Sequence, residues 1–452
     1  LFVRRCWLAL ALLTGLTIFA TARRFVPPES ALVAGMVPLA FAPMWIPSLS
    51  YNTIGMLLLA AGLFCGAAST AGERGAALLA GASVGSLAAA SFVYPPLVVP
   101  ALLSCTITGI QQARRRRWSA VVTLFAAGLA CVAAVGAYVR ALGTGALRET
   151  LALHHALNAA LPEKLSALPH KLLDEAPYRG REIVVMALLA TASLVLRGKA
   201  RHAAVAALLL LLTLFSRDTI VSPGLAIVCA TIFLSVPALR AAKHPLIAMV
   251  WLPSLLAGII TAASSNVGPT NAAVGALAAF IAAIALLSSG ANAAAALALL
   301  LSLHASAWQF VYRDDPIRFL TARVPDGPYR GMITSETRLR FLQSMQSDVK
   351  HYDVKGGSVL FYDDFPAGYL MTRMRPAAPT VWLVSPAYRA FDRNAYRSYY
   401  ASQAHDPDVV FELRANDVAG GDPVRNFFAA SARFRVAADR REWTVYRRAS
   451  AP

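Results

Sequence analysis

The chain has 452 residues, 57% of them hydrophobic, and its mean hydropathy is +0.54. This composition excludes most classes of soluble enzyme, because soluble domains are far less apolar. The formal net charge of +18 would indicate nucleic-acid binding in a soluble protein. Here much of the basic charge lies in short loops between apolar segments, which is typical of membrane topology, so we expect no nucleic-acid partner.

Apolar segments fill the chain up to residue 311. A helix that spans a bilayer needs about 20 apolar residues. The stretch 94–110 is apolar but carries Pro95, Pro96 and Pro100, so we interpret it as a broken span or as a kinked continuation of its predecessor. The sequence predicts a polytopic α-helical membrane domain over 1–311, with about 11–12 helices. The other candidate spans are 6–21, 31–47, 53–69, 75–92, 119–138, 183–196, 203–215, 219–236, 245–263, 271–287 and 291–308.

Basic clusters indicate the orientation of these helices. The arginines at 114–117 mark a cytoplasmic loop, since such loops carry an excess of Lys and Arg. If successive spans cross the membrane in opposite directions, the clusters at 23–24, 197–201 and 240–243 lie on the same side. The long segment 141–182 and the whole C-terminal region are then extracytoplasmic. The high Ala and Arg content is typical of bacterial proteins, so we expect the lipid bilayer to be a bacterial inner membrane.

Arg4 and Arg5 fall on the external side in this count, against the same rule. The chain also begins with Leu and has no signal-peptide pattern. We therefore expect the natural N-terminus to lie upstream of Leu1, with at least one more helix and an external loop before it.

The external segment 141–182 is the first candidate site. Its leucines recur near helical spacing with charges between them, which predicts an amphipathic stretch along the membrane surface. Side chains of Arg, Lys and His match the oxygens of a phosphate, and a carboxylate could activate a hydroxyl. We therefore select His154, His155 and Arg179 as substrate-binding candidates. A solvated amphipathic segment without a ligand is the alternative.

Two shorter external segments hold further candidates. Arg217 and Asp218 lie in a very short loop, where they form an ion pair at a helix boundary or where Arg217 binds a lipid phosphate. The sequence Ser-Tyr-Asn-Thr at 50–53 opens a span, and Ser50 or Asn52 can cap that helix. Alternatively, this segment lines a polar pocket with Tyr94. The complete set of substrate-binding candidates is Arg4, Arg5, Tyr51, Asn52, Tyr94, His154, His155, Arg179, Arg217 and Asp218.

Residues 312–452 are more polar and predict a small soluble α/β domain. Asp363 and Asp364 follow an apolar strand, where loop residues of α/β domains often act. Adjacent carboxylates on a turn point apart, and no metal-ligand spacing accompanies them, so we interpret the pair as a turn. The expected elements are a helix at 335–352, strands at 358–362, 380–384 and 409–413, and a hairpin of 434–437 with 443–447.

All the cysteines lie in apolar segments, and the C-terminal region has none. The spacing indicates neither a disulfide framework nor a metal site. We therefore expect free thiols that pack as small apolar side chains. They are Cys6, Cys65, Cys105, Cys131 and Cys229.

The chain resembles the GT-C class of polytopic membrane glycosyltransferases, such as protein O-mannosyltransferases and lipid A aminoarabinose transferases. The resemblance covers most of the chain and rests on the helix layout, the stretch PSLSYNTIG at 47–55, the long external loop before Ile183 and the stretch SVLFYDDFPAGYL at 358–370. It implies inverting transfer of a sugar from a polyprenyl-phosphate donor to a lipid, glycan or protein acceptor at the outer face of the membrane.

The resemblance also implies a catalytic carboxylate in the first external loop, upstream of Leu1, and places Arg4 and Arg5 near the reaction centre. It implies no certain cofactor and leaves open a divalent cation. Two other functions are compatible with the sequence: a non-catalytic membrane scaffold or export component, and a transporter. The spans carry no deep carboxylate, which argues against an ion-coupled carrier.

Overall fold

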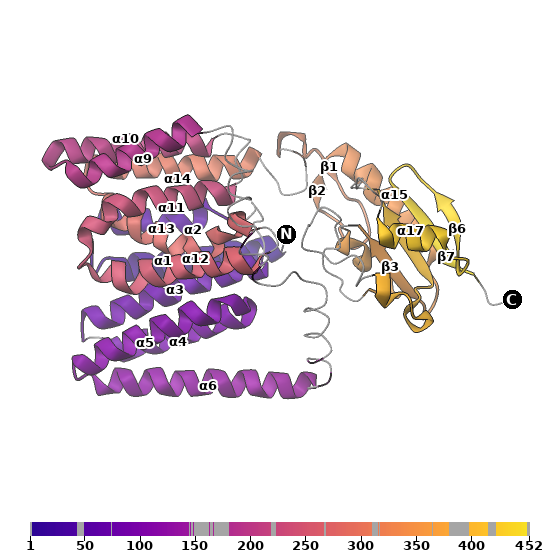
Figure 1. The fold of residues 1–452 in the computed structure, drawn as a ribbon, viewed down its shortest axis with the longest axis horizontal. Helices are drawn as coiled ribbons and strands as arrows, with labels where there is room; N and C mark the ends of the chain where they lie inside the picture. The colour runs from indigo at the N-terminus through magenta and orange to yellow at the C-terminus, as the bar shows by residue number, and fades with distance from the viewer. Residues whose placement is uncertain are drawn as a thin grey trace. The chain divides into compact units, whose positions relative to one another are not determined.

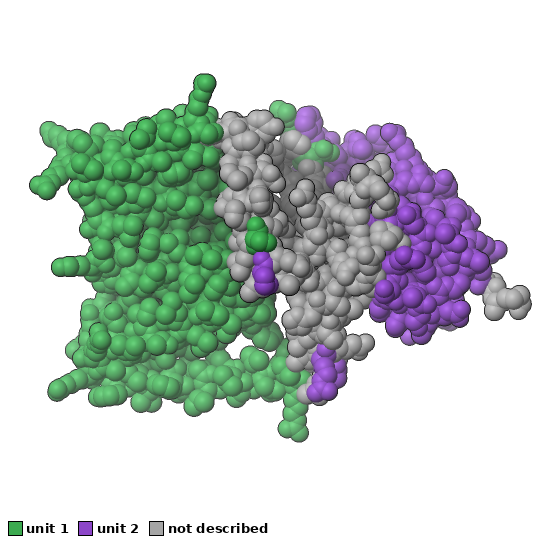
Figure 2. Space-filling model, viewed as in Figure 1, with its two compact units in different colours: residues 1–141, 165–318 green, residues 142–164, 319–452 purple. Residues whose placement is uncertain are grey.

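The structure, a computed structural model, contains two compact units (Figure 2). The helical unit is formed by Leu1–Ala141 and Leu165–Arg318, and the sheet unit by Leu142–Lys164 and Phe319–Pro452. The residues that the structure describes are 2–42, 49–73, 75–143, 145, 148, 162, 166, 180–217, 223–265, 268–309, 315, 317–363, 365–378, 397–414 and 422–449.

The helical unit is an array of apolar helices that run side by side (Figure 1). Its α-helices are α1 (Phe2–Ala22), α2 (Pro28–Ala40), α3 (Tyr51–Ala71), α4 (Ala76–Val93), α5 (Val98–Arg114), α6 (Trp118–Leu142), α9 (Gly180–Val195), α10 (Gly198–Ser216), α11 (Pro223–Ala238), α12 (Leu252–Ser264), α13 (Ala272–Leu287) and α14 (Ala291–Gln309). Short 3-10 or π turns are η2 (Pro95–Leu97), η3 (Leu239–Ala241), η4 (Ile247–Trp251) and η5 (Gly268–Asn271).

Within the described part of the chain, nine helices are long and apolar enough to cross a membrane. The expected broken span at 94–110 is one of them: η2 turns directly into α5, so that Pro95–Arg114 forms a candidate span of 20 residues, separate from α4. The expected span 31–47 is shorter than predicted, because α2 has 13 residues. Helix α9, with 16 residues, and α14, whose apolar part is Asn292–Ser306, match the expected spans 183–196 and 291–308 but are not among the nine.

Hydrogen bonds join the basic helix termini at one end of this unit. Arg24 Nη1 donates to a carbonyl near the end of α3 (3.1 Å), and Arg117 Nη1 donates to a carbonyl just after α3 (2.8 Å). Arg240 Nη1 donates to a carbonyl just after α9 (2.9 Å). His244 Nε2 lies 3.3 Å from the carbonyl oxygen of Phe25, which links the two groups.

These contacts confirm that the basic clusters expected on one side share one end of the unit, which we call the basic end. It carries Arg23, Arg24, Arg114, Arg115, Arg116, Arg117, Arg197, Lys199, Arg201, Arg240 and Lys243. Because each helix runs straight through the array, the starts of α1, α3 and α13 and the ends of α4, α10 and α12 lie at the opposite end. We call it the polar end.

Among the nine candidate spans of the described residues, the one that contains α13, Gly268–Leu287, is the most enclosed, with 89% of its apolar window buried. It packs against α2, α3, α11 and α12. At Gly275 the backbone of α12 comes so close that a Cβ atom would lie 2.1 Å from the carbonyl carbon of Ala257. Small residues allow this backbone contact, as is typical of helices that pack in a membrane.

The sheet unit contains a five-stranded sheet in the order β4-β3-β5-β7-β6. Strand β3 is parallel to β4 and β5, whereas β7 is antiparallel to β5 and β6. The strands are β3 (Ser358–Tyr362), β4 (Arg375–Pro376), β5 (Val409–Leu413), β6 (Phe434–Asp439) and β7 (Trp443–Arg448), with a separate antiparallel pair, β1 (Ala322–Arg323) and β2 (Ile333–Thr334). The helices are α15 (Glu336–Tyr352) and α17 (Pro423–Ala430), with short turns η6 (Ile317–Phe319), η7 (Pro366–Leu370) and η8 (Gln403–His405).

Both faces of the central strands are covered. Val359 and Phe361 of β3 pack in one core with Met345 and Val349 of α15. Leu360 and Tyr362 face the other way, into a core that includes Val424 and Phe428 of α17. This two-sided burial explains why β3 and β5 are nearly continuous apolar runs, as in sheets that carry helices on both faces.

The predicted elements of the C-terminal region are largely confirmed. Helix 335–352 is α15, with Ser335 as its N-cap, and strands 358–362 and 409–413 are β3 and β5. The hairpin of 434–437 with 443–447 is the antiparallel pair of β6 and β7. The expected strand at 380–384 lies outside the described residues, as does Asp364.

We expect Gly275→Ala to destabilise the helical unit by about 1–3 kcal/mol or more, because the new methyl group would overlap the backbone of α12. Gly128→Ala in α6 is the matched control, since nothing lies within 4 Å of the Cβ position there. The control should leave stability unchanged or raise it by up to about 1 kcal/mol, because Ala favours helices more than Gly does. Denaturant unfolding of the purified protein in detergent measures both. Equal effects of the two substitutions would contradict the packing argument.

Candidate functional site

A cluster of uncharged polar side chains lies at the polar end of the helical unit. Asn271 Nδ2, at the start of α13, donates a hydrogen bond to Tyr94 Oη (2.7 Å). Ser264, at the end of α12, also hydrogen-bonds with the Tyr94 side chain. The ring of Tyr51, at the start of α3, lies 5.5 Å from the Tyr94 ring, measured between centroids. The start of α3 and the connection between α12 and α13, which lie far apart in the sequence, therefore meet at Tyr94.

Local backbone features bring these side chains together. Gly55 lies one turn after Tyr51, and a Cβ atom there would be 3.1 Å from Tyr94 Cβ, so the glycine lets α3 and Tyr94 approach closely. Gly268 has a φ of +69°, a left-handed conformation that glycine adopts without strain, and it begins the turn η5 that ends at Asn271. The cluster thus depends on two glycines that the sequence places beside it.

Two amide oxygens at this end have no hydrogen-bond partner among the described residues. They are Oδ1 of Asn52 and Oδ1 of Asn271, whose residues are 7% and 3% exposed. A buried carbonyl oxygen without a partner costs free energy, so each is a position where a donor group from a ligand or a water molecule is favoured. The Tyr51 ring, 39% exposed, lies at the edge of the same cluster.

The structure brings together two of the candidates, Tyr51 at the start of α3 and Tyr94 at the end of α4, and a third, Asn52, follows Tyr51 directly in α3. The capping alternative is settled in favour of Ser50, which forms a capping box with Thr53, so Asn52 is not needed as the cap. Sequence reasoning missed Asn271. Its signal was an asparagine at the start of an otherwise apolar span.

The charged candidates are more scattered. Arg4 and Arg5 are exposed in the first turn of α1, and Arg217 is the exposed C-cap of α10. Among the described residues, none of their side chains forms a hydrogen bond with the Tyr94 cluster. The remaining four candidates, His154, His155, Arg179 and Asp218, lie outside the described residues.

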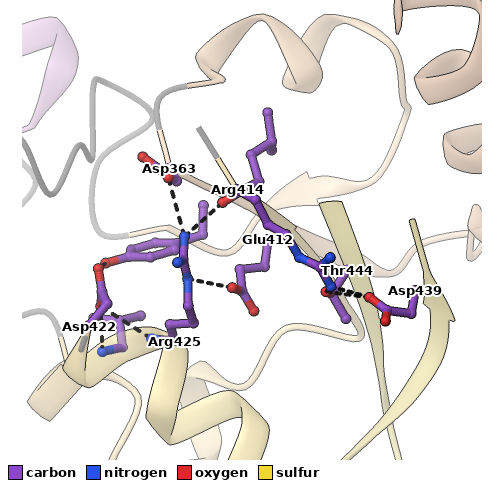
Figure 3. A network of polar contacts seen from close by, with 10 residues as sticks. Asp363, Glu412, Arg414, Asp422, Arg425, Asp439 and Thr444 are labelled. Atoms are coloured by element: carbon purple, nitrogen blue, oxygen red, sulfur yellow. Dashed lines mark hydrogen bonds and ion pairs between the residues drawn. The ribbon is translucent and has the colours of Figure 1, made fainter. Parts of the chain in front are cut away.

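A second polar network lies in the sheet unit (Figure 3). Arg425 of α17 points between the ends of β3 and β5, with Nη2 3.4 Å from Asp363 Oδ2 and Nε 2.5 Å from Glu412 Oε1. Its Nη2 also donates to the carbonyl of Leu413 (3.0 Å). Asp363 is fully buried and Glu412 is 3% exposed, so this one guanidinium balances two buried carboxylates.

Asp422 fixes the position of Arg425. Its Oδ1 accepts hydrogen bonds from the backbone N–H groups of Val424 (2.8 Å) and Arg425 (3.2 Å), which makes it the N-cap of α17. Its Oδ2 accepts from Tyr362 Oη at the end of β3 (2.7 Å). The start of α17 is therefore attached to the sheet at the point where Arg425 enters it.

This network lies where the strand order reverses. Tyr362 and Glu412 are paired at the carboxyl ends of the parallel strands β3 and β5, β4 lies beyond β3, and β7 and β6 lie beyond β5. Ligands often bind at such a point in α/β sheets. Here the carboxylates are buried and ion-paired, so the network acts as a structural link among β3, β5 and α17.

The interpretation of Asp363 as a simple turn residue was incomplete. Its φ of +72° is left-handed, which Asp tolerates better than most residues, and its carboxylate is buried in the network. Glu412 was a signal that sequence reasoning missed: it is a charged residue inside the apolar strand VVFEL. Across the described part of the chain, no group of three His, Cys, Asp or Glu residues is arranged to hold a metal ion.

The chain matches no protein-family model and no curated protein sequence.

Replacing Arg425 by Met should destabilise the sheet unit by about 3 kcal/mol, the low end of the usual cost of breaking a buried ion pair, because Arg425 is 21% exposed. The substitution keeps most of the side-chain volume but leaves Asp363 and Glu412 without their counter-charge. Arg435→Met on β6 is the control, since Arg435 is exposed. Hydrogen–deuterium exchange of β3 and β5 in the full chain measures the change. Equal hydrogen-exchange protection in the Arg425→Met and Arg435→Met variants would contradict this prediction.

The substitution Glu412→Gln should change how the stability of the sheet unit depends on pH. Burial raises the pKa of Glu412 above its ordinary value of 4.5, and the charges of Arg425 and Arg414 offset this only in part. Between the ordinary and the raised pKa, the folded state keeps a proton that the unfolded state has lost, so stability falls as the pH rises through that window.

In the Glu412→Gln variant, stability should fall less as the pH rises. Burial also raises the pKa of Asp406, so the loss of stability that comes from Asp406 should remain. The measurement is the hydrogen-exchange protection of β5 across the acidic range. The same pH slope in wild type and variant would show that Glu412 does not titrate in this way.

Proposed function

We propose that this chain is a multi-pass membrane glycosyltransferase that moves a sugar from a polyprenyl-phosphate donor to a lipid, glycan or protein acceptor. Its apolar helices would span a bacterial inner membrane, with the basic end in the cytoplasm, because basic residues concentrate in cytoplasmic loops. The polar end and the C-terminal sheet unit would then lie on the outer side.

The observation that carries this proposal is the Tyr94 cluster at the polar end. It offers a phenol and an amide that donates to that phenol, and the two buried amide oxygens without described partners, those of Asn52 and Asn271, lie at the same end of the unit. The half-exposed ring of Tyr51 lies beside it. The hydroxyl groups of a ligand can donate hydrogen bonds to such oxygens, and aromatic rings pack against the apolar faces of sugars. The cluster therefore suits a neutral sugar group better than an ion.

In the proposed reaction, the acceptor hydroxyl attacks the anomeric carbon of the sugar and loses its proton through solvent to the phosphate that leaves. The bond between that carbon and the phosphate oxygen breaks, and the lipid phosphate leaves with the electron pair. Asn52 and Asn271 accept hydrogen bonds from the sugar and orient it. A cation near the leaving phosphate stabilises the developing charge, and Arg217, exposed at the same end of the unit, is our candidate for that role.

Tyr94→Phe and Asn271→Ala should each lower kcat/KM for sugar transfer by about 10–100-fold, since each removes one partner of a buried hydrogen bond. Arg217→Ala should lower kcat with a smaller change in KM, because the charge on the phosphate develops in the transition state. The assay follows labelled sugar from a panel of polyprenyl-phosphate sugars into membrane acceptors, with the protein in liposomes.

Tyr138→Phe in α6 is the matched control, because it also removes one phenol hydroxyl, from a ring that is 50% exposed. It should retain full activity. The proposal is wrong if the wild-type protein transfers no sugar from the panel, or if the Tyr94 and Asn271 variants, still folded, work at the wild-type rate.

A further inference from the structure

A cavity of about 450 Å³ opens on the sheet unit beside α17. Its size is within the range of about 300–1,000 Å³ that is typical of small-molecule sites. Part of the described lining comes from α17 and its C-cap: Asn426, Phe427, Ala430 and Ser431. The other described lining residue is Arg397. None of these side chains is part of the Arg425 network.

The charged and polar part of the lining consists of hydrogen-bond donors. Arg397 is exposed, and among the described residues its guanidinium forms no hydrogen bond or ion pair. The Asn426 amide is exposed as well, and Ser431 provides a hydroxyl. Arg397 is the charged residue of the described lining, so this part of the lining presents a positive charge to a ligand. A guanidinium with such a surrounding matches a phosphate or carboxylate group.

Arg433 holds this lining in place without adding free charge. Its Nη1 pairs with the buried carboxylate of Asp406 (3.1 Å), and its Nη2 donates to the carbonyl of Tyr400 (2.8 Å). Its guanidinium also covers one side of the Phe427 ring, with Cζ 5.1 Å from the ring centroid. The backbone N–H of Arg433 donates to Ser431 Oγ (3.3 Å). The wall formed by Phe427 and Ser431 is therefore built before any ligand arrives.

The apolar part of the lining is the half-buried ring of Phe427 with the methyl group of Ala430. The two residues are three positions apart in α17, so they lie on the same face of the helix. A flat apolar surface next to hydrogen-bond donors fits a ligand with one apolar face and polar edges, as a pyranose ring has. A bare anion would use the arginine but leave most of the cavity empty.

We propose that this cavity binds an anionic saccharide, a sugar unit that carries a phosphate or a carboxylate. Arg397 pairs with the anionic group, Asn426 and Ser431 bond to hydroxyls, and Phe427 with Ala430 contacts the apolar face of the ring. The argument for this binding site uses the cavity alone and does not depend on the proposed function. Its role as the place where the sheet unit holds a glycan acceptor rests on the proposed function.

Isothermal titration of the full chain in detergent tests the site with four probes: glucose 6-phosphate, glucuronate, glucose and inorganic phosphate. At least one of the two anionic sugars should bind at least about tenfold more tightly than glucose or inorganic phosphate. The better of the two identifies the anionic group. Failure of both to bind, or inorganic phosphate binding as tightly as the phosphorylated sugar, would overturn the proposal.

Two pairs of variants locate the binding. Arg397→Ala should weaken it by about tenfold or more, whereas Arg435→Ala, which removes an exposed arginine of the same unit outside the lining, should not. Ala430→Glu introduces a negative charge into the cavity and should abolish binding, whereas Ala429→Glu, exposed on the same helix outside the lining, should have little effect. Wild-type affinity in both Arg397→Ala and Ala430→Glu would place the ligand elsewhere and refute the assignment.

A further variant separates this inference from the proposed function. Tyr94→Phe should keep full affinity for the anionic sugar, because Tyr94 belongs to the helical unit. If the wild-type protein transfers no sugar but the titration still depends on Arg397, the glycosyltransferase proposal fails and the binding site stands. Loss of binding in Tyr94→Phe would show that the sugar occupies the helical unit instead.

Discussion

The backbone contact between α12 and α13 is the constraint on which the helical unit depends. At Gly275 there is no space for even a methyl group, so the two helices are held at one distance and in one register. Helix α13 is enclosed by its neighbours along most of its length. Asn271 stands at its first turn, so the same contact that positions α13 also sets where this amide lies relative to Tyr94.

The helical unit distributes its polar groups unevenly between its two ends. Arginines at the basic end donate hydrogen bonds to carbonyl groups at the ends of neighbouring helices. They therefore link the helix ends to one another and also give this end its positive charge. The polar end holds an uncharged cluster around Tyr94, and the exposed Arg217 is the C-cap of α10 at the same end. This asymmetry agrees with the orientation that we propose, in which the basic end faces the cytoplasm.

The sheet unit uses its charges in two ways. Arg425 is turned inward and links three elements through buried carboxylates, which stabilises the fold and leaves little for a ligand. On another face of α17, Arg397 has no partner among the described residues and lies beside the exposed part of Phe427. One short helix thus connects a structural network and a candidate binding cavity, and only the second offers an unsatisfied charge.

The sequence by itself determined the apolar helices, the strands β3 and β5 and the division into apolar and polar regions, because these follow from local hydrophobicity and periodicity. It also indicated Tyr51, Asn52 and Tyr94. The tertiary structure decided which polar groups meet. Asn271 and Tyr94 are 177 positions apart, and Arg425 is 62 positions from Asp363. Such pairs depend on how helices and strands pack, and no local pattern encodes the distance between two side chains that only packing brings together.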